Sequence, residues 1–230
     1  VHSALLRKDT GLDGNNMPRV TDIRDGMHPV VTAVGLEIAV EVAEGIRLEE
    51  RLRHNATHGR FVSPFPAQVA GIGEMGDSVG ELLTGRTGGT TMLYASGPRA
   101  GQITPADTLA MRVHLFNTEL NDLDSFANDV RVTGKGDHLA VTAGLYSATQ
   151  AIDMDWTWNS YLVEVNRRHG APIDVAGADG TVLTRDGLYA YGVPYWGDCC
   201  QRSYDVRYTI HAPYLAATIE AERLTFDASL

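Results

Sequence analysis

The feature that most constrains this chain is a repeated alternation of apolar and polar residues with a period of two. In the stretch 36–42 the even-numbered residues are Leu, Ile, Val and Val, and the odd-numbered residues are Glu, Ala and Glu. A polar Glu44-Gly45 pair follows, and the alternation then resumes over 46–53. Such alternation is typical of strands with one apolar face, and two runs joined by a short turn predict a β-hairpin.

The same pattern returns in the second half of the chain. Turns at 134–137 and around 221–223 separate further alternating runs, and near Pro213 the pattern slips. We expect a bulge there, because proline cannot donate to a strand ladder. We therefore predict an all-β fold of antiparallel up-and-down strands. The further predicted strands are 111–115, 126–133, 139–146, 203–211 and 224–230.

Two long stretches, roughly His54–Asp107 and Asp153–Gln201, show no strand pattern, and we expect them to be loops with one short helix around 77–83. Tight turns on one side and long loops on the other are typical of bacterial outer-membrane barrels. The sequence thus predicts a partial segment of a large transmembrane β-barrel with long extracellular loops. An antiparallel sandwich would alternate in the same way. Polar faces of mixed charge and aromatic residues near strand ends favour the barrel.

The composition excludes several other classes of protein. The formal net charge of −10 over 230 residues argues against a nucleic-acid partner, which would require a basic surface. No apolar run approaches the roughly 20 residues of a membrane-spanning helix. Leu230 falls inside an alternating run and Val1 is not an initiator residue, so we expect the sequence to be a piece of a longer chain.

Several segments resemble TonB-dependent outer-membrane receptors of the kind common in sphingomonads. The resemblance covers most of the chain and rests on barrel-wall and loop sequence. The segments that carry it are 11–16 (GLDGNN), 61–66 (FVSPFP), 116–123 (FNTELNDL), 128–131 (NDVR), 143–146 (AGLY), 154–161 (MDWTWNSY), 191–197 (YGVPYWG) and 199–204 (CCQRSY).

This resemblance implies a large barrel of 22 strands, closed inside by an N-terminal plug. Such a receptor imports a scarce ligand, namely an iron chelate (siderophore), a vitamin or an oligosaccharide, across the outer membrane of a Gram-negative bacterium. Its partners would be outer-membrane lipid and, through the plug, TonB. The chain shows no plug, no TonB-contacting segment and no aromatic C-terminal residue on a final strand. We therefore expect residues 1–230 to be an internal part of one receptor barrel domain, in which the stretch 28–34 fits the pattern poorly.

Aromatic residues in the second long stretch are the best candidates for ligand contact. Rigid rings supply a large apolar area at low entropic cost, and their polar tips can orient a ligand. The alternative is a membrane-interface girdle or packing between loops. The predicted ligand-binding residues are Trp156, Trp158, Tyr161, Tyr191, Tyr195 and Trp196.

Other motifs carry less weight. The stretch 71–76 matches the G-x-G-x-x-G pattern of dinucleotide sites, but Pro64 and Pro66 spoil a buried strand before it, and we expect a loop. His54 and His58 lack the glutamate of a zinc-protease motif, so we expect no metal there. Scattered acidic residues leave calcium binding as a hypothesis; they are Asp122, Asp124, Asp129, Asp153 and Asp155.

The adjacent Cys199 and Cys200 form neither a disulfide framework nor a spaced zinc pattern, and we expect them to be structural or incidental thiols. No catalytic signature or cofactor motif is present, so the chain is predicted not to be an enzyme and to hold no cofactor. The second hypothesis is a soluble secreted or periplasmic β-sandwich that binds carbohydrate through its loop aromatics. A hydrolase with an unrecognised site is the third.

Overall fold

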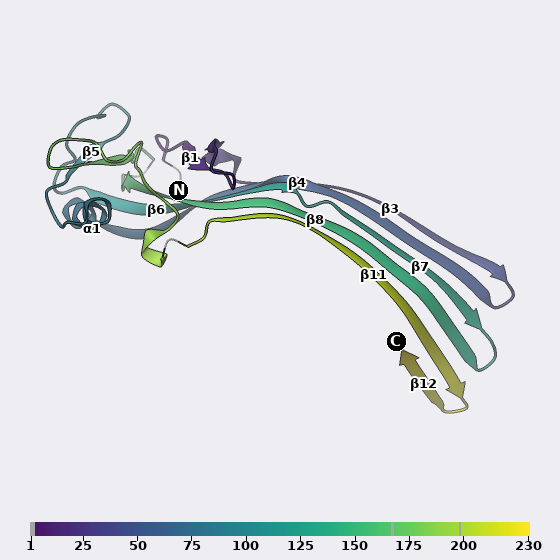
Figure 1. Ribbon diagram of the computed structural model, residues 1–230. Coiled ribbons are helices and arrows are strands. Elements are labelled where there is room, and N and C mark those ends of the chain that lie inside the picture. Colours follow the sequence, from purple (N-terminus) through teal and green to yellow (C-terminus); the bar gives the residue numbers. More distant parts are fainter. Residues whose placement is uncertain (1–2, 167, 198) are drawn as a thin grey trace. The chain divides into compact units, whose positions relative to one another are not determined.

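The computed structural model describes residues 3–166, 168–197 and 199–230 (Figure 1). Most of them lie in antiparallel strands, which confirms the all-β prediction. In the described part of the chain, neither the single α-helix nor the 3-10 turns have the length and apolar character needed to cross a membrane. The elements are β1 Lys8–Leu12, β2 Pro18–Asp22, η1 Ile23–Asp25, β3 Met27–Ala43, β4 Ile46–Gly71, α1 Ile72–Thr84, β5 Thr91–Tyr94, β6 Leu109–Asp122, β7 Ser125–Lys135, β8 Leu139–Glu164, β9 Ile173–Ala176, β10 Leu188–Tyr191, η2 Pro194–Trp196, β11 Arg202–Ala221 and β12 Leu224–Ser229.

The main sheet follows the order of the chain. Its strands are ordered β12-β11-β8-β6-β4-β3, and β7 pairs with both β4 and β8. Strands β6 and β7 therefore occupy the same position in the sheet, one after the other, between β4 and β8. Because consecutive strands lie side by side, the predicted up-and-down arrangement is confirmed. Strand β10 adds to β8, while β1–β2 and β5–β9 form two small separate sheets.

All three predicted hairpins are present, but the predicted long loops are partly wrong. Strand β4 continues to Gly71 and β8 continues to Glu164, and α1 begins at Ile72, five residues before the predicted helix, and ends at Thr84. The prolines at 64 and 66 are tolerated because this part of β4 has an open side. The Val62 amide, which points the same way as those two nitrogens, donates to Gly26 O (2.8 Å), just before β3 begins.

The bulge predicted at Pro213 is not needed. His211 Nδ1 lies 3.1 Å from Ser147 Oγ on one face of the sheet, and the Tyr214 hydroxyl donates to Asp129 Oδ1 (2.8 Å) on the other. Residues three apart occupy opposite faces of a regular strand, whereas an extra residue would bring them to the same face. The sequence pattern changes at Pro213 while the strand keeps its register.

The chain divides into two compact units. Unit 1 comprises Val1–His28, Arg60–Glu119 and Asp155–Ser203, and unit 2 comprises Pro29–Gly59, Leu120–Met154 and Tyr204–Leu230. Unit 1 contains two hydrophobic clusters. In the first, α1 packs through Met75 and Val79 against strand residues such as Leu162 and Ile173. The second joins Leu6 and Ile23 of the N-terminal segment to residues of β6 and β8.

The N-terminal ribbon β1–β2 is fixed to unit 1 by a buried polar network. Asp9 is fully buried and accepts hydrogen bonds from Asn117 Nδ2 (2.8 Å), Asn159 Nδ2 (2.7 Å) and the Tyr161 hydroxyl (2.7 Å). A carboxylate in this position is stable only because several donors converge on it. This network occupies one face of the sheet of unit 1.

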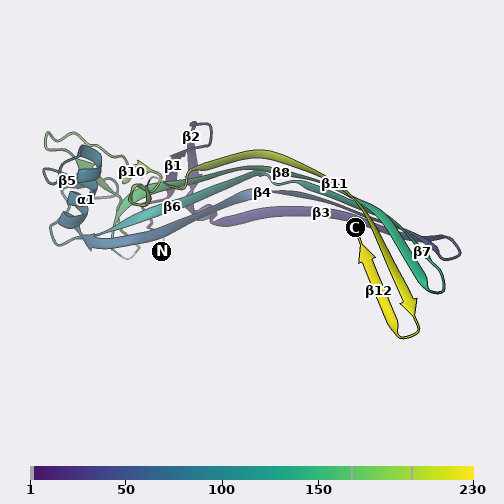
Figure 2. The ribbon, with the colours of Figure 1, turned by 60° about the horizontal axis from the view of Figure 1, so that its bottom comes forward.

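Unit 2 has no comparable core. Among the described residues, Ala151 is the only buried hydrophobic residue that belongs to it. Both ribbon views show its strands as one sheet with no second layer over them (Figures 1 and 2). The side chains of unit 2 are therefore sorted by sheet face rather than by inside and outside.

The strand register defines the two faces of unit 2. Leu48 lies opposite Val132, which lies opposite Ala143, while the next residue on β4, Glu49, lies opposite Arg131. Arg131 Nε donates to Glu49 (2.8 Å), so these charges share a face. On the same face Arg51 pairs with Glu37 at 3.0 Å, which leaves the even-numbered apolar residues of β3 on the other face.

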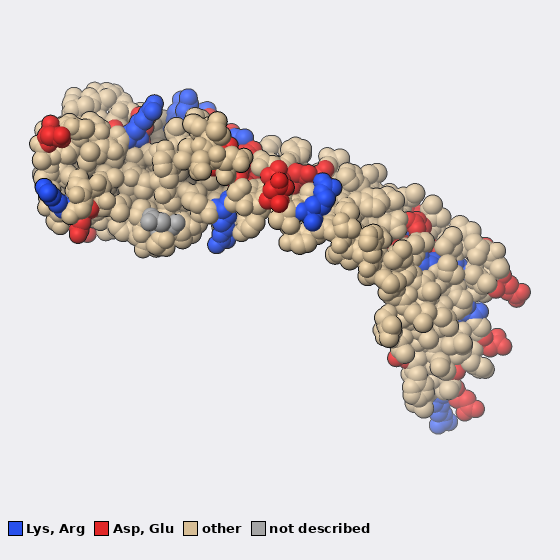
Figure 3. All heavy atoms as spheres, in the orientation of Figure 1, with Lys and Arg blue, Asp and Glu red and all other residues tan. Residues whose placement is uncertain are grey.

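We call the two surfaces the apolar face and the ionic face. Both include residues from β3, β4, β7, β8, β11 and β12. The apolar face carries Leu36, Ile38, Val40, Val42, Ile46, Leu48, Val130, Val132, Val141, Leu145, Leu215, Ile219, Leu224 and Phe226. Figure 3 shows charged side chains along the margin of one end of the molecule and a further group of acidic and basic side chains in the middle of the same view.

Candidate functional site

Three of the six predicted ligand-binding residues come together in unit 1. Trp156 and Trp158 alternate along β8, and Trp196 of η2 lies beside Trp158, with ring centroids 6.1 Å apart. All three were predicted to lie in the long loop 153–201. This is wrong for Trp156 and Trp158, because β8 extends through them, while Trp196 lies in the short turn η2 between β10 and β11. We define the aromatic cluster as Phe61, Phe65, Phe116, Trp156, Trp158 and Trp196.

Five of the six rings come from the strands β4, β6 and β8, and Trp196 comes from η2. Phe116 of β6 is central, with ring centroids 5.1 Å from Trp156 and 5.0 Å from Trp158. Phe65 of β4 contacts Trp158 and Trp196 edge to face. Such edge-to-face contacts stabilise the packing of the rings beyond what their buried area contributes.

Part of the cluster remains open to a ligand. Phe65 and Trp196 are each 48% exposed. The indole nitrogens of Trp156 and Trp158 are buried and donate no hydrogen bond. The cluster thus offers ring faces and edges to a flat or ring-shaped molecule.

A buried histidine supports the cluster from β6. His114 is 1% exposed, and its ring centroid lies 5.2 Å from that of Trp196. Ser160 donates to Gly192 O (2.7 Å), so its oxygen accepts from His114 Nδ1 at 2.8 Å, which assigns the Nδ1–H tautomer. Burial, and then the charge of Arg112, lower the pKa of His114 to about 4, so the ring is neutral at neutral pH.

Two arginines flank the aromatic cluster. Arg112 of β6 is 5% exposed, with its guanidinium carbon 3.4 Å from the centroid of the Tyr195 ring. Arg202 of β11 lies over the Trp156 ring at 4.9 Å. Both distances are within the range of cation–π attraction.

The remaining three predicted residues lie elsewhere in unit 1. Tyr161 points to the opposite face, where it is 1% exposed and bound to Asp9, so its role is to anchor the N-terminal ribbon. Tyr191 is 52% exposed and lines a separate cavity of about 250 Å³ with Arg202 and Gln201. Tyr195 covers Arg112 rather than joining the cluster of rings.

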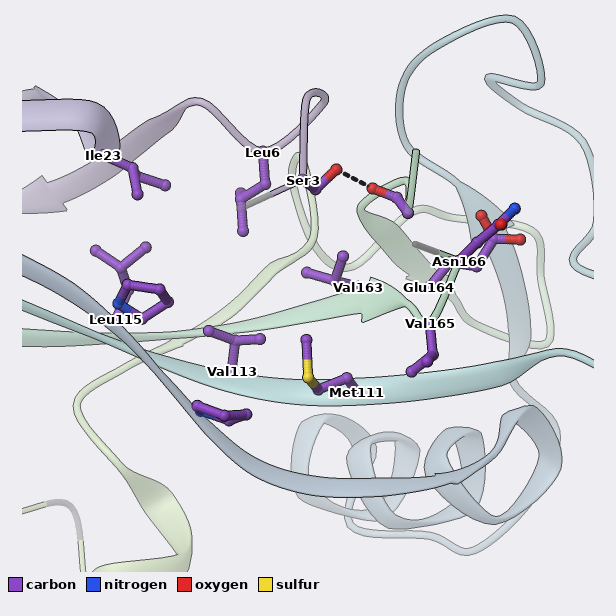
Figure 4. Close-up of a pocket in the computed structure, with 13 residues that line it drawn as sticks. Ser3, Leu6, Ile23, Met111, Val113, Leu115, Val163, Glu164, Val165 and Asn166 are labelled. Carbon is purple, nitrogen blue, oxygen red and sulfur yellow. Dashed lines mark hydrogen bonds between the residues drawn. The ribbon is translucent and has the colours of Figure 1, made fainter. Parts of the chain in front are cut away.

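An apolar cavity of about 310 Å³ lies on the face that the N-terminal segment covers (Figure 4). Leu6 and Ile23 come from that segment, and Met111, Val113 and Leu115 of β6 form the opposite wall. At its edge Glu164 accepts from Arg99 and from the Tyr94 hydroxyl (3.0 Å). Burial opposes ionisation of Glu164, but these hydrogen bonds hold its pKa below the usual value.

The structure also shows the context of the other motifs that the sequence analysis considered. The stretch 71–76 is not a loop, since Gly71 ends β4 and 72–84 is helical, but the adjoining sheet is antiparallel rather than the parallel sheet of dinucleotide sites. Cys199 and Cys200 are bonded to each other, so the expectation of two thiols is wrong. His54 and His58 lie on a strand, not on a helix.

Four of the five acidic residues proposed for calcium accept hydrogen bonds within the protein, and Asp122 accepts from the Asp124 amide (2.7 Å). Asp153 accepts from Asn121 (3.0 Å), Asp124 from the Thr57 amide (2.9 Å) and Asp129 from Tyr214. In the part of the chain that the structure describes, no three His, Cys, Asp or Glu side chains are grouped to hold a metal ion.

Sequence reasoning missed several residues at the site, namely Phe61, Phe65, Arg112, His114, Phe116 and Arg202. Phe65 stands between two prolines that argued against a strand. The i, i+2 spacing of Arg112, His114 and Phe116 was a usable signal, because those residues share one face of a predicted strand.

Comparisons with protein-family models, with curated proteins and with solved structures found no match to this chain.

Proposed function

We propose that unit 2 is part of the wall of an outer-membrane β-barrel and that the chain belongs to a TonB-dependent receptor for a scarce ligand. The observation that carries the proposal is the missing core of unit 2. The apolar side chains of β3, β4, β7, β8, β12 and the end of β11 are gathered on one face of a single sheet, and among the described residues nothing covers them. The first half of β11 differs, because Tyr204, Val206, Tyr208 and Ile210 share the ionic face with Tyr214. In water an uncovered apolar face would be unfavourable by about 25 cal/mol per Å², whereas lipid hydrocarbon removes that penalty.

The extent of the apolar face supports this proposal. The even-numbered residues of β3 are apolar from Val34 to Val42, and this length is at the lower end of the roughly 9–11 residues with which a tilted strand crosses a membrane. Polar residues bound the face at both ends. Near the tight turns lie Glu44 and Lys135, and on the far side Asn128 donates to Glu50 and His211 contacts Ser147. Two polar boundaries are what two membrane–water interfaces require.

The ionic face is suited to a wet interior. Its charged side chains pair across strands, as in Glu49–Arg131 and Glu37–Arg51. A soluble sandwich, the second hypothesis, would instead need another protein layer on the apolar face. No described residue supplies that layer, so we favour the barrel.

In this proposal the aromatic cluster of unit 1 contacts the imported molecule. An iron chelate, a vitamin or an oligosaccharide all present rings or flat surfaces to which aromatic side chains bind. Energy for import would come through TonB and a plug.

The proposal is tested in the bacterium that produces the chain. Deleting the gene should abolish growth on one class of scarce nutrient, supplied as an iron chelate, a vitamin or an oligosaccharide, and the intact gene should restore it. Cell fractionation should place the protein in the outer membrane. Recovery of the protein from the periplasm without detergent would contradict the proposal.

A pair of variants then tests the aromatic cluster. Trp156→Ala combined with Trp196→Ala should reduce uptake at least tenfold. Tyr208→Ala, which removes an exposed ring of unit 2, is the matched control and should leave uptake within twofold of wild type. Unchanged uptake in the double variant would remove the cluster from the ligand path.

A further inference from the structure

Arg112 is a buried positive charge with no negative partner among the described residues. Its side chain contacts Ser78 Oγ (3.0 Å), Met75 Sδ (3.9 Å) and the Tyr195 ring, all of which are uncharged. Its Nε makes no hydrogen bond. Buried arginines are normally paired with a carboxylate, because an isolated charge in a low-dielectric site is costly. Within the described residues, therefore, no carboxylate balances the charge of Arg112.

Tyr195 closes the site from outside and is weakly held. It is 40% exposed, and its hydroxyl lies 3.3 Å from Ser78 Oγ and 3.4 Å from Ser78 O, at the long end of hydrogen-bond distances. It belongs to the three-residue turn η2, which is followed by Gly197 in the left-handed region (φ 70°). Moving this ring aside would open the guanidinium and the Ser78 hydroxyl together.

His114, two residues from Arg112 on the same face of β6, links the arginine to the aromatic cluster, because its ring centroid lies 5.2 Å from that of Trp196. Trp196 directly follows Tyr195 and is half exposed, with its ring centroid 5.8 Å from that of Phe65. His114 is neutral and already bonded through Nδ1 to Ser160, so it adds no second charge. An oxyanion at Arg112 would therefore place the body of its molecule against these rings.

We propose that Arg112 and Ser78 bind the carboxylate or other oxyanion of a flat, ring-containing ligand, in the position that Tyr195 now covers. A guanidinium matches a carboxylate through two parallel hydrogen bonds, which makes arginine selective for that group. The inference rests on the proposed ligand role of the aromatic cluster and names the class of molecule that it would take.

The test uses the full 230-residue chain with benzoate as the probe and benzamide as its neutral counterpart, at matched sodium chloride concentration. Tryptophan fluorescence reports binding, and thermal unfolding reports stabilisation. Benzoate should produce a saturable fluorescence change and a rise in Tm, and benzamide should bind at least tenfold more weakly. Equal binding of the two probes, or no binding of benzoate, would overturn the proposal.

Two variants of Arg112 sharpen the result. Arg112→Gln should weaken benzoate binding at least tenfold without lowering the Tm of the free protein, because it removes an uncompensated charge. Arg112→Lys should retain part of the binding. A large fall in Tm for Arg112→Gln, with wild-type protein indifferent to benzoate, would show that the charge is already neutralised within the chain.

Tyr195→Ala provides a variant that should fold in any case, since the ring is partly exposed. It should tighten benzoate binding several-fold by removing the cover, and unchanged or weaker binding would count against the proposed position. These readouts do not depend on whether unit 2 requires lipid. A soluble chain that binds benzoate through Arg112 would contradict only the membrane proposal.

Discussion

Units 1 and 2 share long strands but are stabilised in different ways. Unit 1 buries both faces of its sheet, under the N-terminal ribbon on one side and α1 with the smaller strands on the other. All the buried polar side chains found among the described residues also belong to unit 1. Unit 2 buries almost nothing and sorts its side chains between two faces. The comparison shows that one alternating pattern can lie under further protein layers, as in unit 1, or on a sheet that no described residue covers, as in unit 2.

The largest effect is expected from a substitution that disrupts the buried polar network of unit 1. Asp9→Ala leaves the donors of Asn117, Asn159 and Tyr161 unsatisfied, and should lower the free energy of unfolding of unit 1 by about 3–5 kcal/mol. Urea unfolding followed by tryptophan fluorescence measures it. Asp22→Ala, on the exposed end of the same ribbon, is the control and should have a much smaller effect. Equal effects would mean that Asp9 does not anchor the ribbon.

The next effect tests the apolar face of unit 2 in lipid. Ala143→Arg places a charge between Val132 and the neighbouring strand on that face, and should destabilise the protein in bilayers by about 2–4 kcal/mol. Thr142→Arg, one residue away on the ionic face, should cost about 1 kcal/mol, chiefly from loss of the Thr133 hydrogen bond (2.9 Å). The measurement is the free energy of unfolding of the two variants in lipid vesicles. Equal losses of stability in Ala143→Arg and Thr142→Arg would argue against contact of the apolar face with lipid.

A smaller effect comes from pH and belongs to unit 1 alone. Because burial, and then Arg112, lower the pKa of His114 to about 4, the folded state takes up a proton less readily than the unfolded state. Stability is therefore full above pH 6.5 and falls as the pH drops toward 4, by about 1–3 kcal/mol. Unfolding measured from pH 7 to pH 4 should show this loss, and His114→Gln should remove most of it. A profile unaffected by the substitution would contradict the assignment.

The sequence predicted unit 2 better than unit 1, for a physical reason. Where one face is apolar and the other polar, as in 36–42, alternation remains visible and both the strands and their turns can be predicted. In β4 beyond His54 and in β8 beyond Asp153, both faces carry packed side chains, so the period disappears and loops were predicted instead. The strand that ends at Gly71 and the start of the helix at Ile72 were missed, because Pro64 and Pro66 argued against a strand before that position.

The candidate site was predicted only in part, because it is assembled from segments far apart in the chain. Trp156, Trp158 and Trp196 were predicted because aromatic residues are frequent in the stretches around them. Phe65 and Arg112 join them only through the pairing of β4, β6 and β8, which no local pattern reveals. Tyr161 carries the same type of side chain as Tyr195, but strand alternation turns it to the opposite face.

The central claim is that the apolar face of unit 2 touches hydrocarbon, and nitroxide labels along β3 test it most directly. In a Cys199→Ser, Cys200→Ser background, single cysteines at positions 36–42 would be labelled and the protein reconstituted in lipid vesicles. Collision rates with oxygen, which concentrates in lipid, and with a water-soluble nickel chelate should alternate with a period of two. Val40→Cys should be accessible mainly to oxygen and Glu41→Cys mainly to nickel. Equal nickel accessibility at both positions, or protection of Val40→Cys from both reagents, would contradict the account.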